Sequence, residues 1–196
     1  ETKNGPSRQL LRSIEDDYRG RLPAARGVAN DIAALLHTCP QIHACSVEVA
    51  DTHTIEEHLS TDNRGEGTKR ITLDNYLTAI PPPVTVSGLY LFEQQRTLVH
   101  RFVVDTWECR ETPLALVPES ADEATTAELT GEGCELRTHG GDDTYICYLP
   151  AATGRKRVPP VRICIRNLFA DALEHLGSTM ETLRESTLRS LDHYLA

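Results

Sequence analysis

The strongest constraint on the fold is a pair of β-rich runs in the middle of the chain, residues 84–92 and 98–109. Only the short polar segment 93–97 separates them, which is a spacing typical of a hairpin. The sequence therefore predicts an antiparallel hairpin here. A second, weaker hairpin is predicted between residues 134–138 and 144–149, because a turn rich in glycine and aspartate joins them.

The rest of the chain predicts two further strands, at 42–50 and 158–166, and helices on both sides of the hairpins. Pro23 predicts the start of a second N-terminal helix, which Pro40 ends. The two prolines Pro159 and Pro160 place the last strand at an edge or delay its start. Regular alternation of strands and helices is absent. The predicted fold class is α+β, with a mostly antiparallel sheet of about five to six strands flanked by N-terminal and C-terminal helices.

Length and charge restrict the organisation and the partners. The 196 residues fit a single domain, 1–196, in which the acidic segment 118–133 is expected to be a mobile loop or a marginal helix. A net charge of -9 makes nucleic-acid binding an unexpected main activity. No apolar run is long enough to cross a bilayer, and residues 1–12 lack the apolar region of a secretory signal. No membrane association is expected.

The chain has six cysteines, and four of them lie inside apolar, strand-like runs. A cysteine in such a run behaves as a small hydrophobic residue. A chain of this length also needs no disulfides to fold. Reduced, mostly buried thiols are therefore expected, and with them an intracellular location, cytoplasmic or nuclear.

One short segment carries residue types that bind metals, namely His37, Cys39, His43 and Cys45. Zinc sites usually take two ligand pairs that a longer loop separates, whereas these two pairs are only three residues apart. They are weak candidates for a structural metal site, and the end of a helix followed by the start of a strand is the favoured interpretation. No cofactor is expected.

One dense basic segment stands out in this acidic chain, formed by Arg155, Lys156, Arg157, Arg162 and Arg166. We interpret it as a candidate surface for a protein partner, an acidic one by charge complementarity. The alternative is a solvated edge that balances the acidic segment. Strand alternation places Arg162, Cys164 and Arg166 on one face, and Val161, Ile163 and Ile165 on the other.

The hairpin at residues 89–108 resembles the strand pair of HORMA-type adaptor domains. Its second strand opens with a charged residue and an aromatic one, Arg101 and Phe102, followed by two valines. The resemblance implies an adaptor module. It covers a small part of the chain, and the long helix that those domains carry after this hairpin is replaced by the acidic segment.

No catalytic motif appears in the sequence, so the reaction, if any, is not revealed. The leading hypothesis is a non-enzymatic interaction domain, an adaptor or scaffold of an intracellular assembly. Its contacts would be the basic segment and the C-terminal helices, through which it could also form homo- or hetero-oligomers. The alternatives are a small hydrolase or transferase whose Cys/His or carboxylate site is assembled from distant positions, and a protein with a structural metal.

Overall fold

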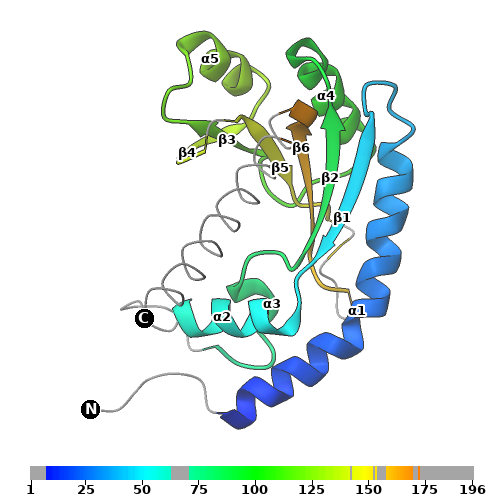
Figure 1. The fold of residues 1–196 in the computed structure, drawn as a ribbon, viewed down its shortest axis with the longest axis vertical. Helices are drawn as coiled ribbons and strands as arrows, with labels where there is room; N and C mark the ends of the chain where they lie inside the picture. The colour runs from blue at the N-terminus through cyan, green and yellow to red at the C-terminus, as the bar shows by residue number, and fades with distance from the viewer. Residues whose placement is uncertain are drawn as a thin grey trace, which may run out of the picture.

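The computed structural model describes residues 8–62, 71–141, 143–151, 153, 158–169 and 172. This part of the chain is an α+β fold built on a six-stranded mixed sheet (Figure 1). In chain order the elements are α1 (Arg8–Leu36), β1 (Ala44–Val49), α2 (Thr52–Asp62), α3 (Tyr76–Ala79), β2 (Val84–Tyr90), the 3-10 turn η1 (Glu93–Gln95), α4 (Arg96–Thr106), β3 (Leu114–Pro118), α5 (Glu123–Gly131), β4 (Glu135–His139), β5 (Tyr145–Tyr148) and β6 (Val161–Asn167). None of the described helices is both long and apolar enough to span a membrane.

The strands lie in the order β1-β2-β6-β5-β3-β4. β6 runs parallel to β2, and β4 runs parallel to β3, whereas the other three pairs are antiparallel. The expectation of a mostly antiparallel sheet is therefore wrong. The last strand starts late, at Val161, as its prolines predict, but it lies in the centre of the sheet. Its apolar face is fully buried there, which an edge position would not provide.

The predicted hairpin at 84–109 does not form. Residues 84–90 are strand β2, but residues 96–106 are helix α4. The buried residues of α4 are Arg96, Val99, His100 and Val103, which is the i, i+3, i+4, i+7 spacing of a helix. Two of these four are polar, so the apolar residues alone do not show the helical spacing. The β-branched residues of the segment favour a strand instead. The resemblance to HORMA-type domains loses its basis, because it rested on this hairpin.

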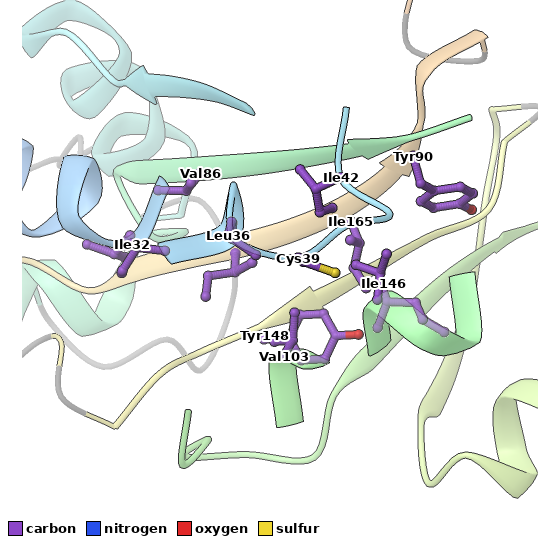
Figure 2. Packing of buried hydrophobic residues seen from close by; sticks show 14 of the residues in the cluster. Ile32, Leu36, Cys39, Ile42, Val86, Tyr90, Val103, Ile146, Tyr148 and Ile165 are labelled. Carbon is purple, nitrogen blue, oxygen red and sulfur yellow. The ribbon is translucent and has the colours of Figure 1, made fainter. Parts of the chain in front are cut away.

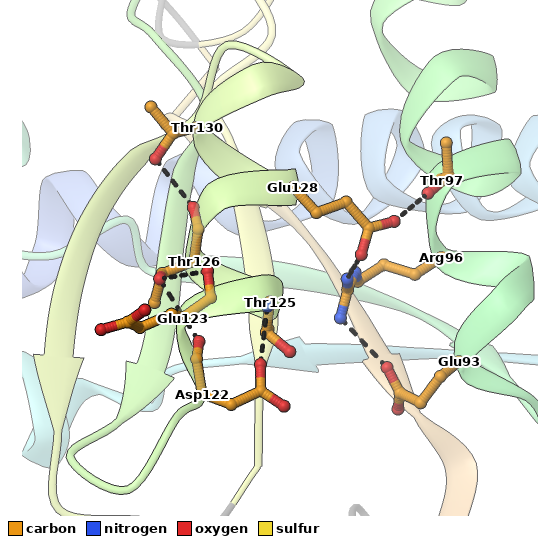
Figure 3. Close-up of polar contacts among 9 residues, drawn as sticks. All are labelled: Glu93, Arg96, Thr97, Asp122, Glu123, Thr125, Thr126, Glu128 and Thr130. Atoms are coloured by element: carbon orange, nitrogen blue, oxygen red, sulfur yellow. Dashed lines mark hydrogen bonds and ion pairs between the residues drawn. The ribbon is translucent and has the colours of Figure 1, made fainter.

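The contacts of α4 explain why two polar residues, Arg96 and His100, are buried on it. The Arg96 guanidinium donates to Glu93 at 3.1 Å and to Glu128 of α5 at 2.7 Å (Figure 3). Thr97 donates to the same Glu128 carboxylate at 2.9 Å. His100 Nδ1 lies 2.8 Å from the Tyr148 hydroxyl. These partners lie 31 to 48 residues away along the chain, apart from Glu93, and they replace water around the buried groups.

The second predicted hairpin is also wrong in its pairing. Both of its strands exist, as β4 and β5, but β3 lies between them and pairs with each. The acidic segment 118–133 contains helix α5, so the helix is the alternative that the structure shows. Asp122 caps this helix by accepting from the Thr125 backbone N–H at 2.7 Å (Figure 3).

Helix α1 continues through Pro23, where the sequence predicts a break. Its buried residues keep one helical stripe along its length: Ile14, Tyr18, Ala25, Ala29, Ile32 and Leu36. Burial of this stripe compensates for the backbone hydrogen bond that proline cannot donate. Figure 1 shows α1 bending between its N-terminal and C-terminal halves.

Two apolar clusters result from this arrangement. In the larger one, the C-terminal half of α1, α4 and Leu129 of α5 pack on one face of the sheet (Figure 2). In the smaller one, Ile14 and Tyr18 of α1 pack with residues of α2, α3 and their flanks. The opposite face of the sheet carries the polar side chains of β1, β2 and β6, and it positions the candidate site.

Candidate functional site

A polar row crosses the three neighbouring strands β1, β2 and β6. Glu48 of β1 is in register with Thr85 of β2, and Thr85 is in register with Arg162 of β6. Side chains in register on adjacent strands point to the same face of the sheet. A carboxylate, a hydroxyl and a guanidinium therefore lie side by side, on the face opposite the larger apolar cluster.

This row opens into a pocket with a volume of about 270 Å³. Its walls are the row itself, the first turns of α2 and the proline segment 81–83. The lining residues are Glu48, Val49, Ala50, Thr54, Ile55, His58, Pro81, Pro82, Pro83, Thr85 and Arg162. The start of α2 is held by Asp51, which accepts from the Thr54 backbone N–H at 2.7 Å and from the Thr54 hydroxyl at 2.8 Å. The hydrogen bonds from Thr54 lower the pKa of Asp51.

Arg162 is the cationic group of the pocket lining. One terminal nitrogen of its guanidinium donates to the Thr85 hydroxyl at 3.2 Å. Its Nε is buried and has no hydrogen-bond partner within the described chain. A buried N–H of a charged group without an acceptor is costly, and in Arg162 it belongs to a side chain that also lines the pocket.

Arg166 lies four residues further along β6, on the same face, and has different partners. It donates to the Asp143 carboxylate at 3.0 Å, and its guanidinium carbon lies 5.0 Å from the centre of the Tyr145 ring. His139 accompanies this group, with Nε2 2.7 Å from the Asp143 backbone oxygen. Arg166 is therefore tied to a neighbouring carboxylate, whereas Arg162 faces the pocket.

Two cysteines lie on this face between the arginines. Cys164 of β6 separates Arg162 from Arg166 along the strand, and Cys147 of β5 is directly opposite it. Their Sγ atoms are 3.0 Å apart. All six cysteines of the chain are free; four are buried and two, Cys45 and Cys109, are half-buried.

The residues predicted as a partner surface divide into two groups. Arg162 and Arg166 take the alternate face of β6, as predicted, and both are partly buried. Arg155, Lys156 and Arg157 lie outside the described residues, as do the C-terminal helices. Binding of an acidic protein partner stays a prediction.

The weak metal candidates do not assemble. Cys39 is buried in the larger apolar cluster, and Cys45 packs against the same cluster. Burial raises the pKa of Cys45 to about 11, which disfavours the thiolate that binds metals. In the part of the chain that the structure describes, no three His, Cys, Asp or Glu residues are placed to hold a metal ion.

One Cys/His contact is assembled from distant positions. Cys134 Sγ lies 4.0 Å from His100 Nδ1, but both residues are in the core and neither lines the pocket. Burial raises the pKa of Cys134 to about 11, so it is a weak nucleophile. We assign it a packing role.

Sequence reasoning missed four polar residues of the pocket, Glu48, Thr54, His58 and Thr85. No motif connects them, because they come from three elements that meet only in the fold. Strand alternation could have placed Glu48 on the face opposite Val47 and Val49, but nothing in the sequence identifies β2 and β6 as its neighbours.

Comparison with known proteins yields a fold likeness alone. No family model matches the chain, and no curated protein matches it. Among solved structures, it is similar to the small alarmone synthetase 1 from Bacillus subtilis, with a TM-score of 0.53 and 14% sequence identity. The match covers 87% of this chain and 81% of that one.

This likeness overturns the leading sequence hypothesis. The neighbour is a synthetase, which is an enzyme, so the prediction of a non-enzymatic adaptor or scaffold domain is wrong. The finding favours the alternative of a small hydrolase or transferase whose Cys/His or carboxylate site is assembled from distant positions.

Proposed function

We propose that this protein is a group-transfer enzyme that binds a phosphorylated nucleotide in the pocket between β1, β2, β6 and α2. The observation that carries the proposal is Arg162, the arginine that lines the pocket, whose buried Nε has no partner among the described residues. A phosphate oxygen is the acceptor that suits such a group, because an arginine fork binds phosphate through two parallel hydrogen bonds.

The fold supports the nucleotide class. The similar solved structure is a synthetase of an alarmone, a phosphorylated nucleotide, and the likeness extends over most of both chains. Fold alone does not carry a function to a new sequence, so the proposal depends on the residues of the pocket.

The other polar residues of the row suit the non-phosphate part of such a substrate. Glu48 lies two strand spacings from Arg162, about 10 Å, which is the scale of a nucleoside. Its carboxylate can accept from a sugar hydroxyl or a base amino group. Thr85 holds the guanidinium of Arg162 in place between them. The proline segment 81–83 provides apolar contact for a base.

The test is the affinity of the purified full chain for ATP and GTP with Mg²⁺, measured by isothermal titration calorimetry. We expect Arg162→Ala to weaken binding about tenfold or more, the loss associated with a hydrogen bond to a charged group. Arg162→Lys keeps the charge but loses Nε, so it should recover only part of the affinity.

The matched control is Arg19→Ala, which removes an arginine of the same size from α1, where 61% of its side chain is exposed. Its affinity should equal that of the unmodified chain. Failure of the unmodified chain to bind either nucleotide, or equal binding by the Arg162 and Arg19 variants, would contradict the proposal.

A further inference from the structure

Cys147 and Cys164 have the backbone geometry of a disulfide without being bonded. They are directly opposite each other on the antiparallel strands β5 and β6. Opposed residues of such strands have Cα atoms about 4.5–5.5 Å apart, which is within the range that a disulfide spans. The two Sγ atoms are already 3.0 Å apart, so bond formation needs an approach of about 1 Å.

The surroundings of the pair make one of its thiols acidic. The hydrogen bond from Cys164 lowers the pKa of Cys147 against the opposing effect of burial, and the positive charges of Arg162 and Arg166 lower it further. The hydrogen bond with Cys147 and burial raise the pKa of the partner thiol, Cys164. By contrast, burial raises the pKa of Cys109 and of Cys134, so these cysteines lack an activated thiolate.

We propose that Cys147 and Cys164 are a redox pair that hydrogen peroxide converts to a disulfide and that a small thiol reduces again. The Cys147 thiolate attacks one peroxide oxygen, the O–O bond breaks, and the other oxygen leaves as water after protonation. The Cys164 thiol then attacks the sulfenic sulfur, an S–S bond forms, and the sulfenic oxygen leaves as a second water. Two thiols lose two electrons, and one peroxide is reduced to two waters.

The position of the pair selects a small oxidant. Only 7% of Cys147 and 4% of Cys164 is exposed, so peroxide reaches them more easily than a protein thiol would. A disulfide between directly opposed residues ties β5 to β6 beside Arg162, the arginine of the pocket.

The experiment treats the reduced full chain with increasing hydrogen peroxide, blocks remaining thiols with an alkylating reagent, and maps peptides by mass spectrometry. We expect a peptide pair joined through Cys147 and Cys164 to appear first, with the other four of the six cysteines still alkylated. Dithiothreitol should restore alkylation of both. In Cys164→Ser, which keeps a hydrogen-bond donor beside Cys147 but has no thiol, Cys147 should be trapped as a sulfenic acid by dimedone.

The matched control is Cys109→Ala, which removes a half-buried cysteine whose pKa burial raises and should form the bond as the unmodified chain does. A different cysteine pair oxidising first, or only single-cysteine adducts at Cys147 in the unmodified chain, would overturn the proposal. The readout contains no nucleotide, so it is independent of the proposed function.

Discussion

Single residues decide the character of α4. Arg96 and His100 occupy two of its four buried positions, and each is accommodated by a partner that the fold supplies: Glu128 for Arg96 and Tyr148 for His100. A buried polar residue that has hydrogen-bond partners contributes to the packed face as an apolar one does. The helical face of α4 therefore consists of apolar and polar residues together.

Val103 tests this assignment of the buried face. It is fully buried in the larger cluster, so Val103→Ala should lower the free energy of unfolding by roughly 1–3 kcal/mol through lost burial and a residual cavity. The next residue, Val104, is 39% exposed and offers the same substitution as a control. Urea denaturation of both variants measures the difference. An equal loss of stability for Val103→Ala and Val104→Ala would show that the buried face of α4 is assigned incorrectly.

Among the elements, α1 unites the two apolar clusters because it is a single helix with a continuous buried stripe. It carries Gly20 in its exposed surface, where an added Cβ would meet nothing within 4 Å. Gly88 of β2 is the opposite case, because an added Cβ would lie 3.0 Å from Ile42 and 3.7 Å from Leu36, at the end of this helix. The absence of a side chain at Gly88 therefore allows the end of α1 to approach β2 closely.

These two glycines should respond in opposite directions. Gly20→Ala should raise the free energy of unfolding by about 0.5–1 kcal/mol, because alanine costs less backbone entropy in a helix. Gly88→Val should lower it by about 1–3 kcal/mol through overpacking between α1 and β2. Thermal unfolding followed by circular dichroism compares them, and a stabilising Gly88→Val would show that the end of α1 is not tightly packed on the strand.

For the whole molecule, a group of hydrogen bonds at the edge of the smaller cluster ties α1 to the segments that pack against it. Asp17 accepts from Tyr76 at 2.8 Å and from Arg21 at 2.7 Å, and Tyr18 donates to the Ala50 backbone oxygen at 2.7 Å. Partial burial would raise the pKa of Asp17, but the hydrogen bonds from Arg21 and Tyr76 outweigh it, so this pKa is lowered. The pocket lies beside these contacts, since Ala50, which accepts from Tyr18, also lines the pocket.

The lowered pKa of Asp17 predicts a pH dependence. A carboxyl whose pKa is lower in the folded state stabilises the fold at pH values above its unfolded pKa, near 3.8, and loses that effect as pH falls through the folded value. Asp17→Asn should therefore cost about 1 kcal/mol at neutral pH and progressively less in acid. Urea denaturation from pH 7 to pH 3 measures this. An equal cost at both ends of the range would assign the effect to shape rather than charge.

Local pattern predicted much of the local structure. The strand alternation of β6 assigned its faces, and its late start follows from Pro159 and Pro160. The strands β4 and β5 were predicted within one residue of their observed bounds. The errors concern features that depend on contacts distant in the sequence. They are the pairing of the strands, the predicted break of α1 at Pro23, and the assignment of residues 96–106 to a strand instead of a helix.

The sequence by itself determined the α+β class and the face of β6 on which Arg162, Cys164 and Arg166 lie, since both depend on the spacing of residues close together in the chain. Only the tertiary structure decided that β6 lies between β2 and β5, and with this the row from Glu48 to Arg162 and the contact between Cys147 and Cys164. Strand order depends on the burial of whole faces over long sequence separations. The spacing of residues close together in the chain does not reveal which strand order buries those faces best.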